Sequence, residues 1–547
     1  MDETTSGVRA GQWARPWKRS ASRVMALVMA LAVAATTVGV AMPGAWAPAA
    51  WGQPTEALTL AESFAVSSVP VGGTTTLTFT VAQTYPETLY GVSFTDDLPP
   101  GLQFQPASAV SGCAGSLMAT ASSVSLSVDG NLNLITECQI SVTVVGVAAG
   151  SQVNTTSPIT SAGTAPGAAA SATLLVVAPP TLSESFDPSS VAVNGTSTLT
   201  FTLTNPNDSL ITGVGFSDTF PVGLVVAAVP NLMFSGSANC NPPAGANPGS
   251  TMLTFPATIL DAGDSCTFSV NVTAVTPGNL VNTTTPVTSE EGGNGAAATA
   301  TLMVSRVPTA TTIKVSSANP GFGQPVTFTA TVKPTGPNGG GVNPTGTVSF
   351  YLNGSSTPIA VVPLSAKGTA TFSTTGLAAR METVTAAYSG DANFLPSSSS
   401  TGATTTVTCT QTITGTHAAL VLAHGSTCVL DATISGSIIV PSGAALDLEN
   451  STVQGAVSAT SGTTGLRMCG SSASSVTVEN STGFVVIGDP ADGCGTNVLN
   501  GSLTLIDNSG GVQAIGNFVA GAVTAINNTG AGPFPDDTAP NISGNGR

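Results

Sequence analysis

The chain has 547 residues, enough for about three to five domains, but only 7% of them are charged, against about 25% in typical soluble domains. Its formal net charge is −16, and residues 53–547 contain 7 basic and 26 acidic side chains. This excess of negative charge argues against nucleic acid as a partner, because phosphates are bound by Lys and Arg.

The N-terminal 52 residues predict a secretory signal peptide. Basic side chains end at Arg23, residues 24–40 are apolar, and Ala45-Trp46-Ala47 is a small-residue cleavage motif, with Ala50 an equal candidate for the cleavage site. The alternative is an uncleaved membrane anchor, for which the apolar run of about 17 residues is short. We therefore expect an extracellular or cell-surface protein with no membrane span in its mature chain.

Two related β-rich modules follow. Residues 76–81 alternate apolar side chains with threonines, the pattern of a half-buried strand, and the pattern returns at residues 198–203. Residues 61–102 match residues 183–224 at a constant offset of 122, with about half the positions identical. These matches predict a duplicated module.

In both copies this strand precedes a turn of the pattern D-x-L-P-x-G-L, residues 96–102 and 218–224, although Phe220 and Val222 depart from it in the second copy. Together the strand and the turn resemble the domain-of-unknown-function repeats (family eleven and its relatives) of bacterial surface proteins. The resemblance extends over about 250 residues. It implies Ig-like β-sandwiches on a cell surface and no catalytic residues.

The third module contains the segments Pro-Thr-Gly-Thr-Val-Ser-Phe-Tyr-Leu-Asn-Gly (344–354) and Ala-Tyr-Ser-Gly-Asp-Ala-Asn-Phe (387–394). Both resemble a bacterial Ig-like domain of group three, a type used in adhesins and envelope proteins. The resemblance implies a seven-strand sandwich of about 100 residues. The module has no cysteine, so we expect its own hydrophobic core to suffice for its stability.

In the last part of the chain, short apolar segments alternate with corners rich in Asn and Gly. The corners lie at residues 449–451, 479–481, 507–509 and 527–529. Their spacing of about 20–30 residues predicts a parallel β-solenoid, whose stacked coils share one core. Asn suits such corners because it tolerates left-handed backbone and can form hydrogen-bonded ladders. A further β-sandwich is the alternative.

The predicted fold is thus all-β, with tandem Ig-like sandwiches followed by a small parallel β-solenoid. The predicted segments are a signal peptide (1–52), two β-sandwich repeats (56–178 and 180–305), a bacterial Ig-like domain (307–407), a solenoid-like domain (408–535) and a polar tail (536–547).

All eight cysteines can pair with a neighbour in sequence, as expected of disulfides in an exported chain. The expected pairs are Cys113 with Cys138, Cys240 with Cys266, Cys409 with Cys428, and Cys469 with Cys494. A zinc site of Cys409, His417, His424 and Cys428 is disfavoured, because their spacing of eight, seven and four residues lacks the paired C-x-x-C or H-x-x-x-H arrangement that places two ligands on one turn. We therefore expect no metal and no cofactor.

Candidate catalytic residues are few. Asp489 and Asp492 lie close enough in sequence to act as paired carboxylates on a polysaccharide, and a stack of Glu449, Glu479 and Asp507 along one edge of the solenoid is a second arrangement. We favour a loop role for the first two and solvated corners for the other three.

No Lys or Arg occurs between Arg23 and Arg306, so a Lys-Asn isopeptide bond is impossible in the first two modules. We expect a non-enzymatic structural or adhesion protein that binds envelope or extracellular polysaccharide, or surface proteins, through the solenoid. The first alternative is a carbohydrate-binding or polysaccharide-cleaving solenoid, and the second is a building block of a surface layer.

Overall fold

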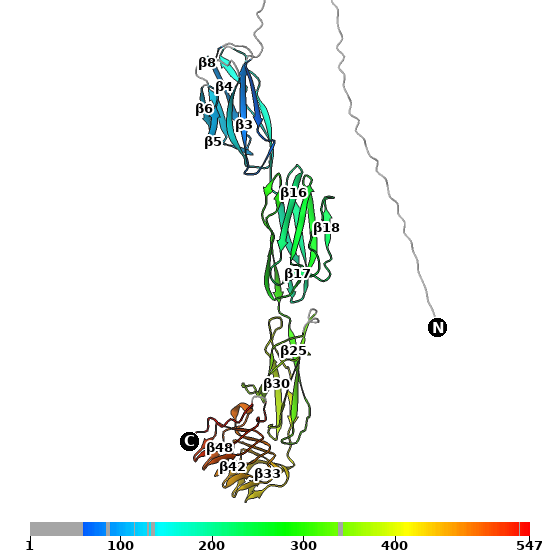
Figure 1. Cartoon of the computed structure of the whole chain (residues 1–547), viewed down its shortest axis with the longest axis vertical. Coiled ribbons are helices and arrows are strands. Elements are labelled where there is room, and N and C mark those ends of the chain that lie inside the picture. Colours follow the sequence, from blue (N-terminus) through cyan, green and yellow to red (C-terminus); the bar gives the residue numbers. More distant parts are fainter. Residues whose placement is uncertain are drawn as a thin grey trace, which may run out of the picture. The chain divides into compact units, whose positions relative to one another are not determined.

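The computed structural model describes residues 58–83, 88–113, 115–127, 131–132, 137–162, 164–336, 343–534 and 537–546. The predicted signal peptide lies outside them. Throughout the described residues the chain forms strands, and the only helical element among them is the 3-10 turn η1 (Pro490–Asp492) (Figure 1). No helix within these ranges is long and apolar enough to cross a membrane.

The first repeat is a β-sandwich of sheets ordered β1-β3-β9-β5, β10-β12-β2 and β11-β4-β7-β6, with β8 beside β4. Leu77, Phe79 and Val81 are fully buried, whereas Thr78 and Thr80 between them are partly exposed. The predicted alternation is thus confirmed. Its strands are β1 (Leu58–Phe64), β2 (Ser68–Pro70), β3 (Thr74–Gln83), β4 (Leu89–Asp97), β5 (Leu102–Ser111), β6 (Ser116–Ala119), β7 (Ser123–Ser127), β8 (Asn131–Leu132), β9 (Cys138–Gly146), β10 (Gly150–Thr155), β11 (Thr160–Ala162) and β12 (Ser171–Val177).

The second repeat has corresponding sheets, β13-β15-β20-β17 with β18, β14-β24-β21 and β19-β16-β22-β23. The two copies keep the same register, because Glu62 lies opposite Phe79 and Glu184 opposite Phe201. Its strands are β13 (Thr181–Asp187), β14 (Ser190–Ala192), β15 (Thr196–Thr204), β16 (Ile211–Thr219), β17 (Leu224–Val226), β18 (Met233–Gly236), β19 (Met252–Leu260), β20 (Ser265–Ala274), β21 (Gly278–Thr283), β22 (Thr288–Ser289), β23 (Gly293–Asn294) and β24 (Thr299–Ser305).

The third sandwich consists of the sheets β25-β26-β29 and β28-β27-β30-β31, with β32 also paired to β30. Phe328, Phe350 and Phe372 from both sheets form its centre, with ring centroids 4.7–5.2 Å apart in the two contacting pairs. Its strands are β25 (Thr309–Val315), β26 (Val326–Pro334), β27 (Thr347–Leu352), β28 (Ala360–Pro363), β29 (Thr369–Thr374), β30 (Met381–Tyr388), β31 (Ser397–Ser398) and β32 (Ala403–Thr406).

The last domain is a parallel β-solenoid, as predicted. One sheet, β46-β43-β40-β37-β35-β38-β41-β44-β47 with β33, bends around two sides, and the sheet β34-β36-β39-β42-β45-β48 forms another. Its strands are β33 (Gln411–His417), β34 (Leu420–Val421), β35 (Gly425–Ile434), β36 (Ile438–Val440), β37 (Ala444–Glu449), β38 (Thr452–Val453), β39 (Ala456–Ala459), β40 (Gly465–Cys469), β41 (Ser472–Ala473), β42 (Ser475–Glu479), β43 (Phe484–Gly488), β44 (Val498–Leu499), β45 (Leu503–Ile506), β46 (Val512–Ile515), β47 (Phe518–Val519) and β48 (Val523–Ile526).

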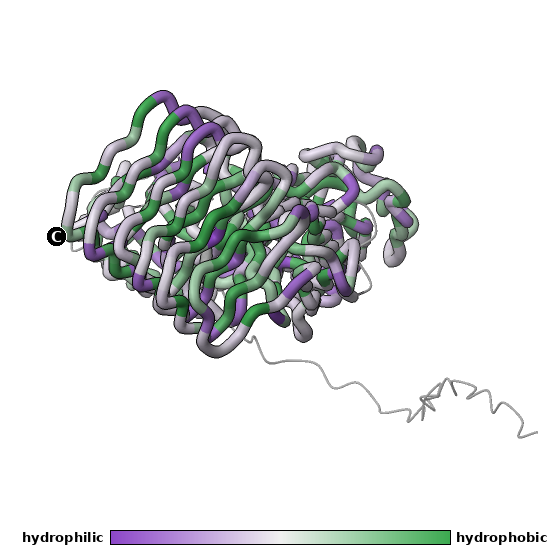
Figure 2. Tube along the Cα trace, turned by 90° about the horizontal axis from the view of Figure 1, so that it is seen from below, coloured by the Kyte–Doolittle hydropathy of each residue, from purple (hydrophilic) through white to green (hydrophobic). Residues whose placement is uncertain are grey.

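The solenoid core is built by stacking like residues. Apolar residues recur at the same place in successive coils (Figure 2), and their side chains form one buried cluster. The corners turn where the sequence predicts, with positive φ at Asn450, Asn480, Asp507 and Asn527. Asparagine ladders also form. The Asn497 amide donates to Asn517 Oδ1 at 2.9 Å, and the Asn508 amide to Asn528 Oδ1 at 2.8 Å. These ladders satisfy buried polar groups that the turns would otherwise leave without partners.

Candidate binding surface

One side of the solenoid is covered by the third sandwich. Outward-pointing side chains of β37, β40 and β43 are all buried, and several join the hydrophobic core of that sandwich. The Phe484 ring, for instance, lies 5.8 Å from the Phe322 ring of the third sandwich. We call these residues the covered face: Ala445, Asp447, Glu449, Arg467, Cys469, Phe484 and Val486. The core of the third sandwich therefore does not end at its own sheets but continues into the solenoid.

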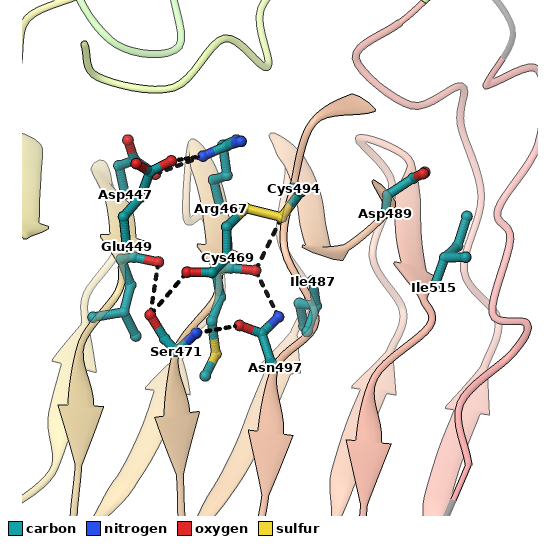
Figure 3. Close-up of a disulfide and its surroundings, with 12 residues drawn as sticks. Asp447, Glu449, Arg467, Cys469, Ser471, Ile487, Asp489, Cys494, Asn497 and Ile515 are labelled. Carbon is teal, nitrogen blue, oxygen red and sulfur yellow. Dashed lines mark hydrogen bonds and ion pairs between the residues drawn. A yellow bond between two sulfur atoms is a disulfide. The ribbon is translucent and has the colours of Figure 1, made fainter. Parts of the chain in front are cut away.

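An ion cluster lies at this contact. Arg467 is 2% exposed and pairs with Asp447 at 3.5 Å and with Glu449, and Figure 3 shows the three side chains converging. From the sandwich, Arg380 donates to Glu449 at 3.0 Å and to Glu382 at 2.9 Å. Two guanidinium groups thus compensate three carboxylates.

Burial is the largest influence on the pKa of two of these carboxyl groups, Asp447 and Glu382. It raises the pKa of Asp447 above its ordinary value, although Arg467 opposes the shift. The backbone N–H of Ala379 also donates to Asp447 Oδ2 at 2.7 Å, which links the sandwich backbone directly to the solenoid. Burial likewise raises the pKa of Glu382 against the charge of Arg380.

A second side of the solenoid is open. Consecutive strands place Ile439, Ser458, Thr477, Thr504 and Thr524 in one register, and we call this column the open face. All five side chains are partly or fully exposed. The strands of this sheet, β34, β36, β39, β42, β45 and β48, contain a single charged residue, Glu479 at the end of β42. The open face is therefore a flat, nearly uncharged surface with hydroxyl groups at the spacing of stacked strands, about 4.8 Å.

A polar cluster recurs inside the two repeats. In the first, the Asn154 amide donates to Asp96 at 2.8 and 2.9 Å and to Glu62 at 3.2 Å. In the second, the Asn282 amide donates to Asp218 at 2.8 Å and to Glu184 at 3.0 Å. We call each trio a carboxylate–amide cluster. Asp96 and Asp218 begin the repeated turns at residues 96–102 and 218–224, but no pattern in the sequence indicated that a glutamate from the first strand would join them.

The structure places the candidate catalytic residue Asp489 in a buried turn of the solenoid. Asp489 is 4% exposed, and its side chain accepts from Ala491 N and caps η1, which agrees with the predicted loop role. The alternative in which Glu449, Glu479 and Asp507 stack along one edge is not found, because Glu449 lies on the covered face, whereas Glu479 belongs to the sheet of the open face. Glu449 is also not a solvated corner, since the third sandwich buries it.

The structure joins the cysteines in four disulfides. They are Cys113–Cys138, Cys240–Cys266, Cys409–Cys428 and Cys469–Cys494. Cys409 and Cys428 are thus bonded to each other rather than free to bind zinc with His417 and His424. Within the described ranges no group of His, Cys, Asp and Glu has the arrangement of a metal site.

These features define a multidomain all-β protein of sandwiches and a solenoid. Residues 59–176 and 180–304 each match the family model described as domain of unknown function (DUF7933), and residues 311–408 match the bacterial Ig-like domain of group 3. The chain therefore contains two DUF7933 segments and one bacterial Ig-like domain, which confirms both resemblances drawn from its sequence. No curated protein sequence matches it significantly.

Several similar solved structures are bacterial surface proteins. The C-terminal domain of the AgI/II polypeptide BspA of Streptococcus agalactiae has 11% identity and TM-score 0.30, over 45% of this chain and 100% of that one. Invasin, a bacterial integrin-binding protein, has 17% identity and TM-score 0.27, over 60% and 56%. The Escherichia coli adhesin FdeC has 15% identity and TM-score 0.18, over 65% and 98%. Identities and TM-scores this low carry no argument about the function of this chain.

Proposed function

We propose that this chain is a non-catalytic bacterial surface protein of the adhesion type, exported by its N-terminal signal peptide, in which the sandwiches support a solenoid that binds polysaccharide. The bacterial Ig-like domain supports the surface assignment. The open face carries the binding part of the proposal, because Ser458, Thr477, Thr504 and Thr524 stand in register on it, on a sheet whose strands contain a single charged residue.

The chemistry of the open face suits an uncharged, repetitive polymer. Thr477, Thr504 and Thr524 stand opposite one another on adjacent strands, so their hydroxyl groups form an evenly spaced row that can both donate and accept hydrogen bonds. A polysaccharide likewise repeats its hydroxyl groups along its length. The third sandwich leaves this side of the solenoid free while it buries the covered face.

The test is binding of the mature chain to isolated bacterial envelopes and to soluble polysaccharides. In T477Y/T504Y, two bulky rings interrupt the row without entering the core, and we expect binding to weaken at least about tenfold, roughly 1.4 kcal/mol. The matched control is T433Y/T452Y, because Thr433 and Thr452 are also exposed neighbours on adjacent strands, on another side of the solenoid.

Equal binding by both variants would contradict a role for the open face. Sugars should also be measured in the supernatant. Their release by the wild-type chain would refute the non-catalytic part of the proposal and would favour polysaccharide cleavage.

A further inference from the structure

The carboxylate–amide clusters lack a compensating charge. Each places two carboxylates around one amide group deep in a sandwich, where Asp96, Asn154, Asp218 and Asn282 are all fully buried. Unlike the ion cluster at the covered face, they have no guanidinium group nearby, and the sequence of both repeats contains no Lys, Arg or His at all. Only a proton or an ion from solvent can therefore supply positive charge.

The clusters also contain polar atoms without a hydrogen-bond partner. In the first repeat these are Glu62 Oε1 and Asn154 Oδ1. In the second they are the equivalent atoms of Glu184 and Asn282, together with Asp218 Oδ1. Leaving buried acceptors unpaired is unfavourable, and the same arrangement occurs twice. The two copies therefore share a deficiency of donors, not of acceptors.

A proton fits this deficiency better than a metal ion does. Calcium requires about six to eight oxygen ligands at roughly 2.3–2.6 Å, and the amide nitrogen of Asn154 or Asn282 already lies between the two carboxylates. A proton on one carboxyl group needs no extra space, removes one negative charge and converts an acceptor into a donor.

We propose that each carboxylate–amide cluster takes up protons from solvent as the pH falls below neutrality, and that these protons stabilise the repeat that contains them. The three members of each cluster come from three different sheets of the sandwich, for example β1, β4 and β10 in the first repeat. Protonation therefore strengthens the joint between these sheets.

The surroundings of the clusters support this assignment. Around the first cluster, the disulfide-bonded Cys138 is the only side chain of a titratable type on strands β3, β9, β10 and β12. The exposed Asp97 on β4 adds negative charge. Around the second cluster, β15, β21 and β24 have none, β16 has only Asp218, and β13 adds Asp187 at its end.

The direction of the effect follows from burial. Burial, followed by the charge of the neighbouring aspartate, raises the pKa of Glu62 and of Glu184 to about 7. Burial also raises the pKa of Asp96 and of Asp218 to about 6. The folded state thus binds more protons than the unfolded state, so the stability that the protons provide is complete below about pH 4 and is lost as the pH rises to about 7.

The test compares the mature wild-type chain with E62Q/E184Q, which imitates the protonated glutamates. Thermal unfolding at pH 5 and pH 8 would be followed by circular dichroism. Hydrogen exchange, corrected for the intrinsic rate, would be measured on peptic peptides from β1, β4 and β10. Slower exchange at pH 5 than at pH 8 in these peptides would assign the gain in stability to the first repeat. We expect the wild type to unfold at least about 3 °C higher at pH 5, and E62Q/E184Q to lose most of this difference by becoming more stable at pH 8.

The matched control is E137Q/D261N, which removes the same charge at two exposed positions, one in each repeat, and should keep the wild-type pH dependence. D96N/D218N provides a second neutral pair if the glutamine variant does not fold. An unchanged pH dependence in the folded variant would overturn the proposal. So would calcium chloride stabilising the wild type, but not the variant, at pH 8, because the cluster would then bind a cation.

Discussion

Two kinds of buried acidic cluster occur in this chain, and they are compensated in different ways. At the covered face, Asp447 and Glu449 face Arg467, and Arg380 connects them to the third sandwich. Inside the repeats, paired carboxylates face an asparagine amide and no guanidinium group. The first cluster joins two domains by fixed charges. The second lies within a domain and, by our inference, depends on protons. Both clusters are buried, yet one is neutralised by arginine and the other is not. Burial of a carboxylate therefore does not by itself decide which group neutralises it.

The largest expected effect on the free energy of unfolding is that of R467M. The substitution removes the buried guanidinium group from the cluster at the covered face and leaves its carboxylates without this compensating charge, as in the carboxylate–amide clusters. Breaking a buried ion pair by removing one partner costs roughly 3–5 kcal/mol, because the remaining charges stay buried. The free energy of unfolding of the solenoid should fall by about this amount at pH 8 in urea titrations. It should fall less at pH 5, where Asp447 can take up a proton. A loss equally large at both pH values would contradict this view of the cluster.

An intermediate effect is expected from N282A in the second repeat. The substitution removes the donor to Asp218 and Glu184, and hydrogen bonds to charged groups contribute roughly 1.5–3 kcal/mol. The loss should be greater at pH 8 than at pH 5, as measured by thermal unfolding. N279A is the matched control, because Asn279 lies on the same strand but is exposed. Similar losses in both variants would show that the cluster contributes nothing specific.

The smallest effect is expected from R380M. The Arg380 side chain is 43% exposed, so its removal gives water access to the carboxylates of Glu382 and Glu449, which are themselves buried. Because this water replaces part of the lost charge compensation, the same urea titration should show a loss of about 1 kcal/mol, smaller than that of R467M. A loss as large as that of R467M would mean that the connection between the domains, rather than burial within the solenoid, determines the stability of the cluster.

Much of this architecture could be predicted from local patterns. The alternation at Leu77 and Phe79 identified a half-buried strand, the offset of 122 identified the duplication, and asparagines at the corners identified the solenoid. Each of these signals depends on backbone periodicity or on the conformational freedom of one residue type, which act over short stretches of chain. The loop role of Asp489 was predictable for the same reason, since an aspartate before a proline commonly begins a turn.

The sequence by itself determined which side chains point into each layer, because a strand of period two assigns every residue to one of its two sides. Only the tertiary structure decided what lies against the outer side. Glu449 has the local pattern of a solvated corner, yet the third sandwich buries it. Glu62 has the pattern of an exposed position on the first strand, yet the fold places it beside Asp96 and Asn154. Such contacts join residues far apart in the chain, and no local periodicity encodes them.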